Sequence, residues 1–337
     1  MTISELWLTL LAVAGAAMLS AGVIWTIRPL LLKHALAKPN ARSSHRIPTP
    51  QGAGIAVIAA TLVVAGFVIA GTDSSGSTFP AAAFGATLFI AVVGFADDLK
   101  SIPVLIRLVL QAIAVGAILF AAPDDLRIAP AFPFWIERGL LLLAMLWFVN
   151  LVNFMDGLDW MTVAEVLPIA AAMIVLGWLG EFPLSPAIVA ATLCGAMMGF
   201  APFNRPVATI FLGDVGSLPI GLLLGWCLLQ LAWQQHFAAA LLLPLYYLSD
   251  ATITLLHRVV RGEPFWAAHR SHFYQRATDN GFTVLQVVRE VFVLNLALAA
   301  LAIASTEIRS SALGVVLVAA GGAAVAFSMY RFSRRRS

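Results

Sequence analysis

The sequence predicts an all-α polytopic membrane protein, formed by a single domain that covers residues 1–337. Hydrophobic residues make up 61% of the chain and charged residues 11%, whereas a typical soluble domain carries about 25% charged residues. The mean hydropathy is +0.93, and long apolar runs follow one another along nearly the whole chain. These observations favour an integral membrane protein over a soluble protein with a very large core.

Each apolar run is long enough to be a candidate span, since crossing a bilayer takes roughly 17–25 mostly apolar residues. The expected spans cover residues 5–27, 52–71, 80–96, 103–122, 137–155, 161–179, 186–202, 216–235, 237–257, 284–304 and 311–330. We therefore predict about 10–11 transmembrane helices. The third and seventh runs are short, which suggests helices that are tilted or partly re-entrant.

The basic residues predict the orientation of the chain. None precedes the first apolar run, whereas Arg28, Lys33 and Lys38 follow it, and this order does not suit a cleaved signal peptide. Because positive charge collects in cytoplasmic loops, the N-terminus is expected outside and the basic tail of residues 331–337 in the cytoplasm. The pI of about 9.1 then reflects these loops, and no nucleic acid is expected as a partner. Cys194 and Cys227 lie in apolar runs and suggest neither a disulfide nor a metal site.

Five polar clusters interrupt the apolar pattern, and the alternation of spans puts all of them on the cytoplasmic side. They are RSSHRIPTPQGAG (42–54), GFADDLKS (94–101), NLVNFMDGLDW (150–160), FNRPVATIFLGDVGS (203–217) and RGEPFWAAHRSHFYQR (261–276). The expected outer loops are short and hold no comparable cluster. This asymmetry predicts one composite site at the cytoplasmic face.

The third cluster places Asn150, Asn153, Asp156 and Asp159 three residues apart at the end of an apolar run. On a helix this spacing keeps them within about half of the circumference, so that all four can face one water-filled cavity. Ionisable groups in a span are costly and usually functional. The alternative is that the asparagines cap neighbouring helices and the aspartates lie in interfacial water.

The other clusters offer carboxylates and cations. Asp97 and Asp98 form a repulsive pair that a cation or a phosphate site would use, or a solvated turn beside Lys100. Asp214 lies between two glycines at an expected helix start, which suits Mg²⁺ with phosphate and also suits a helix cap. The last cluster brings His269, Arg270 and His272, which suit phosphate groups or lipid headgroups better than a zinc ion.

These motifs and their order resemble the polyprenyl-phosphate N-acetylhexosamine-1-phosphate transferases, the MraY- and WecA-like superfamily, over nearly the whole chain. The forms HRSHFYQR and RSSHRIPTP are most similar to the WbpL-type branch, which starts O-antigen or capsule units. Three positions depart from the family pattern. Trp160 replaces the last glycine of the usual DGLDG, Ser101 replaces an acidic residue, and Ala37 replaces an aspartate often seen before KPN.

The resemblance implies a Mg²⁺-dependent enzyme, with Mn²⁺ as a substitute, in the bacterial inner membrane. It would transfer N-acetylhexosamine 1-phosphate from a UDP-sugar to undecaprenyl phosphate within the lipid bilayer, giving undecaprenyl-diphospho-sugar and UMP. The donors to consider are UDP-GlcNAc, UDP-QuiNAc and UDP-FucNAc, and a homodimer is compatible with this reading.

The family motifs also imply roles for individual residues. Asp97, Asp98 and Asp214 are the expected catalytic carboxylates, and Asp214 with Asn153 is expected to hold the metal. The expected substrate-binding residues are Arg42, His45, Arg107, Asn150, Asp156, Asp159, His269, Arg270 and His272.

Two other classes of function stay open at this point. A transporter or flippase of a phosphorylated solute would also use buried charges, but it would place polar residues near the membrane midplane and on both sides. An inactive scaffold for glycan assembly would fit the departures at Ser101 and Trp160, although the motif centres are intact.

Overall fold

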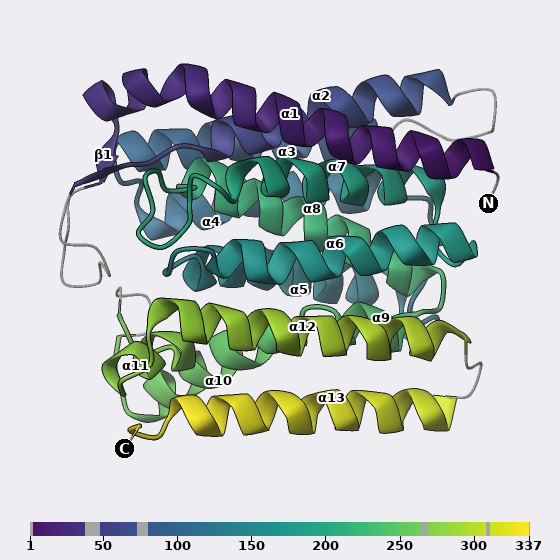
Figure 1. The fold of residues 1–337 in the computed structure, drawn as a ribbon. Helices are drawn as coiled ribbons and strands as arrows, with labels where there is room; N and C mark the ends of the chain where they lie inside the picture. Colours follow the sequence, from purple (N-terminus) through teal and green to yellow (C-terminus); the bar gives the residue numbers. More distant parts are fainter. Residues whose placement is uncertain (1–2, 38–47, 73–79, 265–268, 308–310, 337) are drawn as a thin grey trace.

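The computed structural model describes residues 3–37, 48–72, 80–264, 269–307 and 311–336, and consists almost entirely of helices (Figure 1). The first eight helices are α1 (Ile3–His34), α2 (Gly54–Gly71), α3 (Ala81–Leu99), α4 (Val104–Ala121), α5 (Phe134–Met155), α6 (Met161–Leu179), α7 (Leu184–Phe200) and α8 (Asp214–Trp233). The remaining five are α9 (Phe237–Leu242), α10 (Leu245–Val260), α11 (Phe273–Asp279), α12 (Val284–Glu307) and α13 (Ser311–Phe332). The short strands β1 (Leu36–Ala37) and β2 (Thr49–Pro50) pair antiparallel after α1.

The all-α membrane fold predicted from composition is confirmed. Within the described residues, nine helices are long and apolar enough to cross a membrane, and α7 is a shorter apolar helix of 17 residues. The segment expected as one span at 237–257 is instead divided into α9 and α10. Pro244 lies at this break, and proline interrupts a helix because it has no N–H group to donate.

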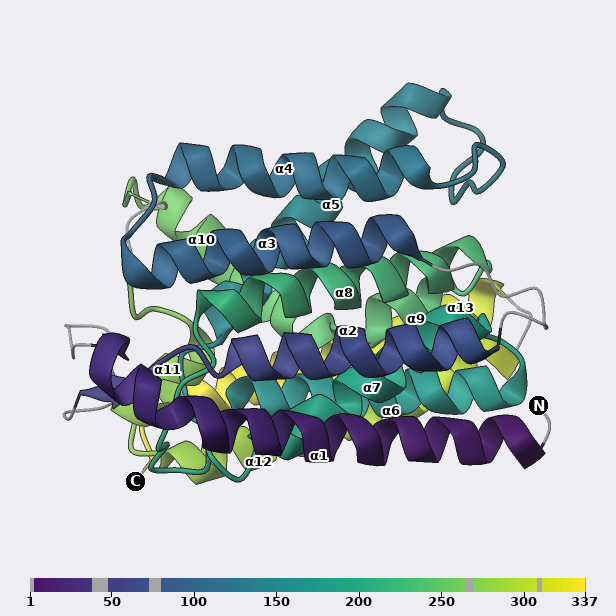
Figure 2. The ribbon, with the colours of Figure 1, turned by 90° about the horizontal axis from the view of Figure 1, so that it is seen from above.

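The long helices lie roughly side by side and reverse direction along the chain, so the connections gather at two ends of the bundle (Figures 1 and 2). The left-hand end in Figure 1, called the motif end below, carries the α1–α2, α3–α4, α5–α6 and α7–α8 connections, α11 and the C-terminus. The N-terminus lies at the opposite end. The described parts of all five polar clusters therefore lie at one end.

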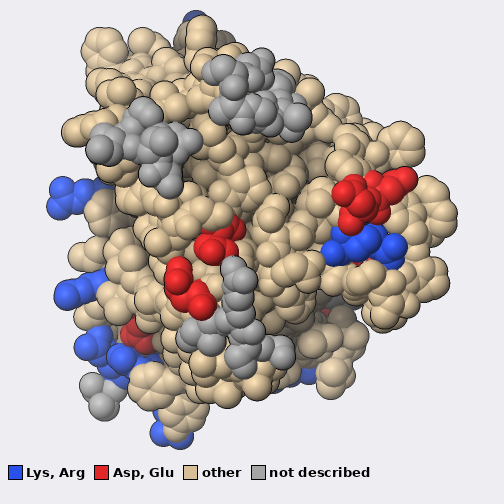
Figure 3. All heavy atoms as spheres, turned by 90° about the vertical axis from the view of Figure 1, so that its right-hand side faces the viewer, with Lys and Arg blue, Asp and Glu red and all other residues tan. Residues whose placement is uncertain are grey.

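The opposite end carries few charges. Seen from that side, the surface is mostly uncharged, with small groups of acidic and basic side chains (Figure 3). This difference between the two ends agrees with the asymmetry expected from the sequence, because the charged clusters lie at the motif end.

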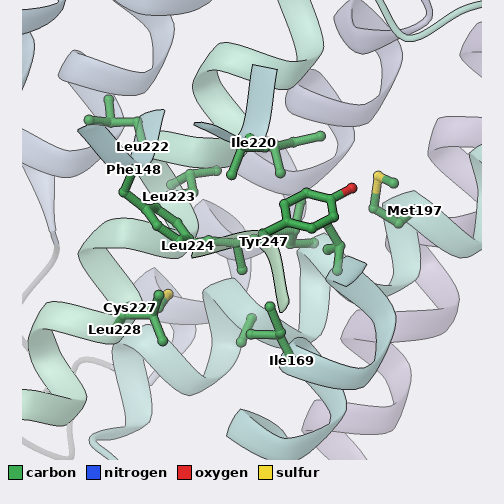
Figure 4. Close-up of a cluster of buried hydrophobic side chains, with 14 of the residues drawn as sticks. Phe148, Ile169, Met197, Ile220, Leu222, Leu223, Leu224, Cys227, Leu228 and Tyr247 are labelled. Atoms are coloured by element: carbon green, nitrogen blue, oxygen red, sulfur yellow. The ribbon is translucent and has the colours of Figure 1, made fainter. Parts of the chain in front are cut away.

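The hydrophobic core is centred on α8. Of the residues in its most apolar stretch, 94% are buried inside the bundle. Around it, side chains from α5, α6, α7 and α10 fill one continuous cluster, which includes Phe148, Ile169, Met197 and Tyr247 (Figure 4). Since α8 begins at Asp214, this rigid central helix holds a motif carboxylate at a fixed depth at the motif end.

Candidate active site

The start of α8 is held by backbone contacts from two neighbouring helices. The amide of Gly54, the first residue of α2, donates to the Leu212 carbonyl at 2.9 Å. On α3, a Cβ atom added to Gly94 would lie 2.3 Å from the Asp214 carbonyl oxygen. Real Cβ atoms do not approach this closely, so only glycine at position 94 lets α3 lie against the loop that carries Asp214.

Asp98 caps α8 from outside that helix. Its Oδ1 accepts the backbone N–H of Asp214 at 2.9 Å, and its Oδ2 accepts that of Val215 at 3.0 Å. The first N–H groups of a helix have no partner within the helix, and an anion there is stabilised by the helix dipole. The carboxylate of Asp98 therefore orients the first turn of α8 and leaves Asp97 as the member of the pair that faces Arg107.

Asp97, Arg107 and Asp214 form an ion cluster. The Nη1 atom of Arg107 lies 2.6 Å from Oδ2 of Asp97 and 3.5 Å from Oδ2 of Asp214. The other oxygen of Asp97, Oδ1, accepts the backbone N–H of Ile102 at 2.5 Å. Arg107 thus bridges two carboxylates on different helices, and its buried Nε has no partner among the described residues.

Asn153 ties α5 to the same cluster. Its Nδ2 donates to Oδ1 of Asp214 at 2.8 Å and to Oγ of Ser217 at 2.9 Å. These bonds use the amide nitrogen, so the amide oxygen of Asn153 is the atom that can bind a cation. Three residues earlier, Asn150 instead donates to the buried Gln111 at 2.6 Å.

The two aspartates of the DGLD turn have different surroundings. Asp156 accepts a hydrogen bond from the hydroxyl of Thr162. Burial is the main reason that the pKa of Asp156 is raised to about 6; the Thr162 hydrogen bond lowers the pKa, and the nearby carboxylates of Asp98 and Asp159 contribute to the rise. Asp159 is buried and accepts the backbone N–H of Ala208 at 3.0 Å, so it fixes the α7–α8 connection.

A fully buried carboxylate, Asp250, organises the histidine cluster. Its oxygens accept the backbone N–H groups of Phe273 at 3.0 Å and Tyr274 at 3.1 Å, at the start of α11. Nδ1 of His272 lies 3.2 Å from the same carboxylate. The hydroxyl of Tyr274 in turn donates to the Phe154 carbonyl at 3.1 Å, so α11 is attached to the end of α5.

These groups surround one cavity of about 780 Å³. Its polar lining residues are Asp97, Ser101, Arg107, Asn150, Asn153, Asp156, Asp214, His269, His272 and Gln275. Leu108, Leu143, Leu146, Trp147 and Leu255 form an apolar wall beside them. Four separate sequence clusters and Arg107 therefore meet at a site that is charged on one side and apolar on the other.

Comparison with known proteins identifies this arrangement. Residues 80–232, which hold GFADD, NLVNFMDGLDW and FLGDVGS, match the model of glycosyl transferase family 4. This match and the curated relatives below support the polyprenyl-phosphate N-acetylhexosamine-1-phosphate transferase superfamily for this chain. The family model thus covers the two carboxylates and the arginine of the ion cluster.

Curated relatives of this transferase align over different lengths. The decaprenyl-phosphate N-acetylglucosaminephosphotransferase of Mycobacterium tuberculosis (strain CDC 1551 / Oshkosh) is 25% identical over 295 residues, which is 77% of this chain and 72% of the relative. The protein of the same description from Mycobacterium leprae (strain TN) is 25% identical over 299 residues, covering 77% and 74%. The phospho-N-acetylmuramoyl-pentapeptide-transferase of Bartonella quintana (strain Toulouse) is 27% identical over 177 residues, 48% of either chain.

Not every residue expected at the site of this transferase faces the cavity. Arg270 turns toward α11, where its Nη2 lies 2.9 Å from Oγ1 of Thr278 and 3.4 Å from Oδ1 of Asp279. Asp98 and Asp159 bind backbone amides, as described above. Arg42 and His45 lie outside the described residues.

Other residues of the site were missed in the sequence. Gln111 and Thr162 are single polar residues in apolar segments, and their positions next to Asn150 and Asp156 reveal them. Ser217 and Gln275 lie within two of the polar clusters but were not singled out, and their positions next to Asn153 and at the cavity reveal them. Asp250 falls in the pattern of the resembled family for this segment, and its role became clear only from its burial and its contacts with α11.

Trp160 adopts a backbone conformation that glycine takes more readily than other residues. Its φ is +63°, in the left-handed region that side chains disfavour. Two hydrogen bonds compensate: its N–H donates to Oδ1 of Asn204 at 2.8 Å, and its indole Nε1 donates to the Ala201 carbonyl at 2.6 Å. These two bonds hold Trp160, at the end of the DGLD turn, in this conformation.

The donor atoms at the cavity suit a magnesium ion. Mg²⁺ binds one or two carboxylates, retains several waters and takes further ligands from substrate phosphates. Asp214 and Asp97 both line the cavity, and Asn153 can add an amide oxygen. Within the described residues no three Asp, Glu, His or Cys side chains gather as a closed metal site, so substrate phosphates would complete the coordination.

Proposed function

We propose that this chain transfers N-acetylhexosamine 1-phosphate from a UDP-sugar to undecaprenyl phosphate. The observation that carries the proposal is the two-sided cavity, in which Asp97, Arg107 and Asp214 lie beside an apolar wall that includes Leu108 and Trp147. A nucleotide sugar needs the charged side, and a polyprenyl chain needs the apolar side. The curated relatives act on decaprenyl phosphate or transfer a phospho-N-acetylmuramoyl-pentapeptide by name, which supports the reaction type.

In this reaction an oxygen of the lipid phosphate attacks the phosphorus that carries the sugar. One P–O bond forms there, the P–O bond to UMP breaks, and UMP leaves with the electron pair of that bond. The acceptor phosphate has its second pKa near 6 and is largely ionised at neutral pH. Hence no strong general base is required, and the protein acts mainly by positioning groups and offsetting charge.

Each described side chain then has a defined task. Arg107 directs its guanidinium at phosphate oxygens, while Asp97 holds that guanidinium in place through the 2.6 Å contact. Asp214 and Asn153, joined by a 2.8 Å hydrogen bond, offer a carboxylate and an amide oxygen to Mg²⁺. When bound, Mg²⁺ or Mn²⁺ would neutralise part of the diphosphate charge.

The remaining cavity residues serve the nucleotide-sugar end. His269 and His272, with ring centroids 4.9 Å apart, both line the cavity. Asp156 and Asp159 shape the turn beside them. We propose UDP-GlcNAc, UDP-QuiNAc and UDP-FucNAc as the donors to compare. We further propose that the product starts an O-antigen or capsule unit, and that the motif end faces the cytoplasm.

The test is release of UMP by the purified full chain in detergent, with undecaprenyl phosphate, Mg²⁺ and one UDP-sugar at a time. Release that needs both the lipid and the metal, with one preferred donor, supports the proposal and names the sugar. Parallel reactions with decaprenyl phosphate decide the length of the lipid. If no donor gives UMP and Asp214→Asn behaves like the parent chain, the transferase proposal is wrong, and uptake of a phosphorylated solute into vesicles becomes the next assay.

A further inference from the structure

A second cavity lies at the end of the bundle opposite the motif end, and the proposed reaction does not use it. Its volume is about 780 Å³, within the range of small-molecule sites. It is enclosed by the α6–α7 and α8–α9 connections and by parts of α9, α12 and α13. It is therefore built from segments that are far apart in the sequence.

The lining of this cavity changes from polar to apolar with depth. Glu181, Gln234 and His236 lie in the connections at its mouth, whereas Leu241, Val315 and Val318 lie further along α9 and α13. Val318 is seven residues into α13, which corresponds to about 10 Å along a helix axis. A ligand that fits this gradient has a polar group at one end and a hydrocarbon chain at the other.

The cavity also opens sideways toward the hydrocarbon of the membrane. Phe237 and Val315, both in its lining, are 58% and 69% exposed. In a protein that spans a bilayer, exposed apolar side chains at this depth are covered by lipid chains. A lipid can thus enter the cavity from the bilayer without crossing water.

The charge at the mouth selects the headgroup. Oε2 of Glu181 lies 3.0 Å from Nε2 of His236, and the other carboxylate oxygen can accept from a ligand. The described residues that line the cavity include no Lys or Arg, and the carboxylate that they offer to a headgroup is that of Glu181. An ammonium group would pair with Glu181, and a phosphate beside it could accept from the side-chain amide of Gln234.

We propose that this cavity is a binding site for a phospholipid with an ammonium headgroup, which places its headgroup at Glu181 and one acyl chain along Leu241 and Val318. The site is separate from the transferase cavity, and the proposal does not depend on the proposed reaction. Bound lipid would tie α9, α12 and α13 to the α6–α7 connection.

The experiment is native mass spectrometry of the full chain after removal of endogenous lipid, with phosphatidylethanolamine or phosphatidylglycerol of the same acyl chains added. We expect one phosphatidylethanolamine per chain, bound about tenfold more tightly than phosphatidylglycerol, as one charge-assisted contact allows. Glu181→Gln keeps the size of the side chain and removes its charge. This variant should bind the two lipids about equally.

A matched pair of variants tests the place of binding. Gly314 lines the cavity, and a Cβ atom there would be in ordinary contact with Cβ of Ala238, 3.6 Å away, so the larger side chain of Gly314→Leu should occupy the acyl part and weaken binding at least about tenfold. Gly322→Leu makes the same change on the same helix, outside the cavity and in open space, and should bind like the parent chain. Thermal unfolding of both variants checks that they fold.

Three outcomes would overturn the proposal. The first is equal retention of the two lipids by the parent chain, which would remove the role of Glu181. The second is parent-like lipid binding by folded Gly314→Leu, which would place the lipid elsewhere. The third is a lipid-free dimer of the chain that Gly314→Leu disrupts, which would make the cavity a contact between two copies.

Discussion

The carboxylate of Asp98 accepts two backbone N–H groups at the start of α8, and the first of them belongs to Asp214, at 2.9 Å. One motif carboxylate thus holds another in position from a neighbouring helix. Asp97, the sequence neighbour of Asp98, contacts Arg107 instead. The adjacent pair therefore has two different tasks, which sequence alone does not separate.

Asp98→Asn should affect stability as well as turnover, whereas Asp214→Asn should affect turnover alone. An asparagine at position 98 offers one acceptor oxygen for two N–H donors, and loss of a helix cap costs about 0.5–2 kcal/mol. We expect a lower unfolding midpoint for Asp98→Asn and a parent-like midpoint for Asp214→Asn with no measurable UMP release. Equal midpoints for the two variants would contradict the capping role.

Arg107→Lys should lower kcat by about 10- to 100-fold with little change in folding. Lysine keeps the charge but lacks the planar group that reaches both Asp97 and Asp214. Arg107→Ala should lose more, because it leaves the two carboxylates facing each other without a cation. Single-turnover UMP release at saturating lipid measures both effects. A lysine variant with parent kcat would show that position 107 acts by charge alone.

Gly94→Ala should destabilise the fold and abolish activity, because its Cβ would lie 2.3 Å from the Asp214 carbonyl oxygen. Separating α3 from α8 should cost about 1–3 kcal/mol, as overpacking does in other cores. Gly85→Ala is the matched control on α3, where no atom lies within 4 Å of the added carbon. That control should keep activity and gain up to about 1 kcal/mol of helix stability. Active, stable Gly94→Ala protein would argue against the close contact.

Trp160→Gly should be more stable than Trp160→Ala by about 1 kcal/mol. Both variants lose the indole bond to the Ala201 carbonyl, but alanine keeps a side chain at φ +63° and glycine does not. Chemical unfolding of the two proteins measures the difference. The reverse order would mean that the turn changes its conformation when the indole is removed.

Asp250→Asn should release the histidine cluster from the cavity. Two backbone amides of α11 and the imidazole of His272 depend on this buried carboxylate, and an asparagine cannot accept all three. We expect a higher KM for the nucleotide sugar with a smaller effect on the KM for the lipid. Parallel KM increases for both substrates would instead indicate general loosening of the fold.

The approximate limits of the long helices could be predicted because a bilayer demands long uncharged segments, and few other folds contain them. The broken helix at Pro244 could not, because the apolar run continues through it without change. The gathering of motifs at one end followed from counting spans, since each span reverses the direction of the chain.

The types of residue at the site were determined by the sequence. Carboxylates at 97, 98 and 214, the amides at 150 and 153, and Arg107 are too costly in a membrane to be incidental. Their division of work was decided only by the tertiary structure. Which oxygen of Asp98 meets which amide, and whether Arg270 turns to the cavity or to Asp279, depends on how α3, α8 and α11 pack. That packing brings Asp98 into contact with residues more than a hundred positions away in the sequence. Local sequence patterns do not show which such residues meet in space.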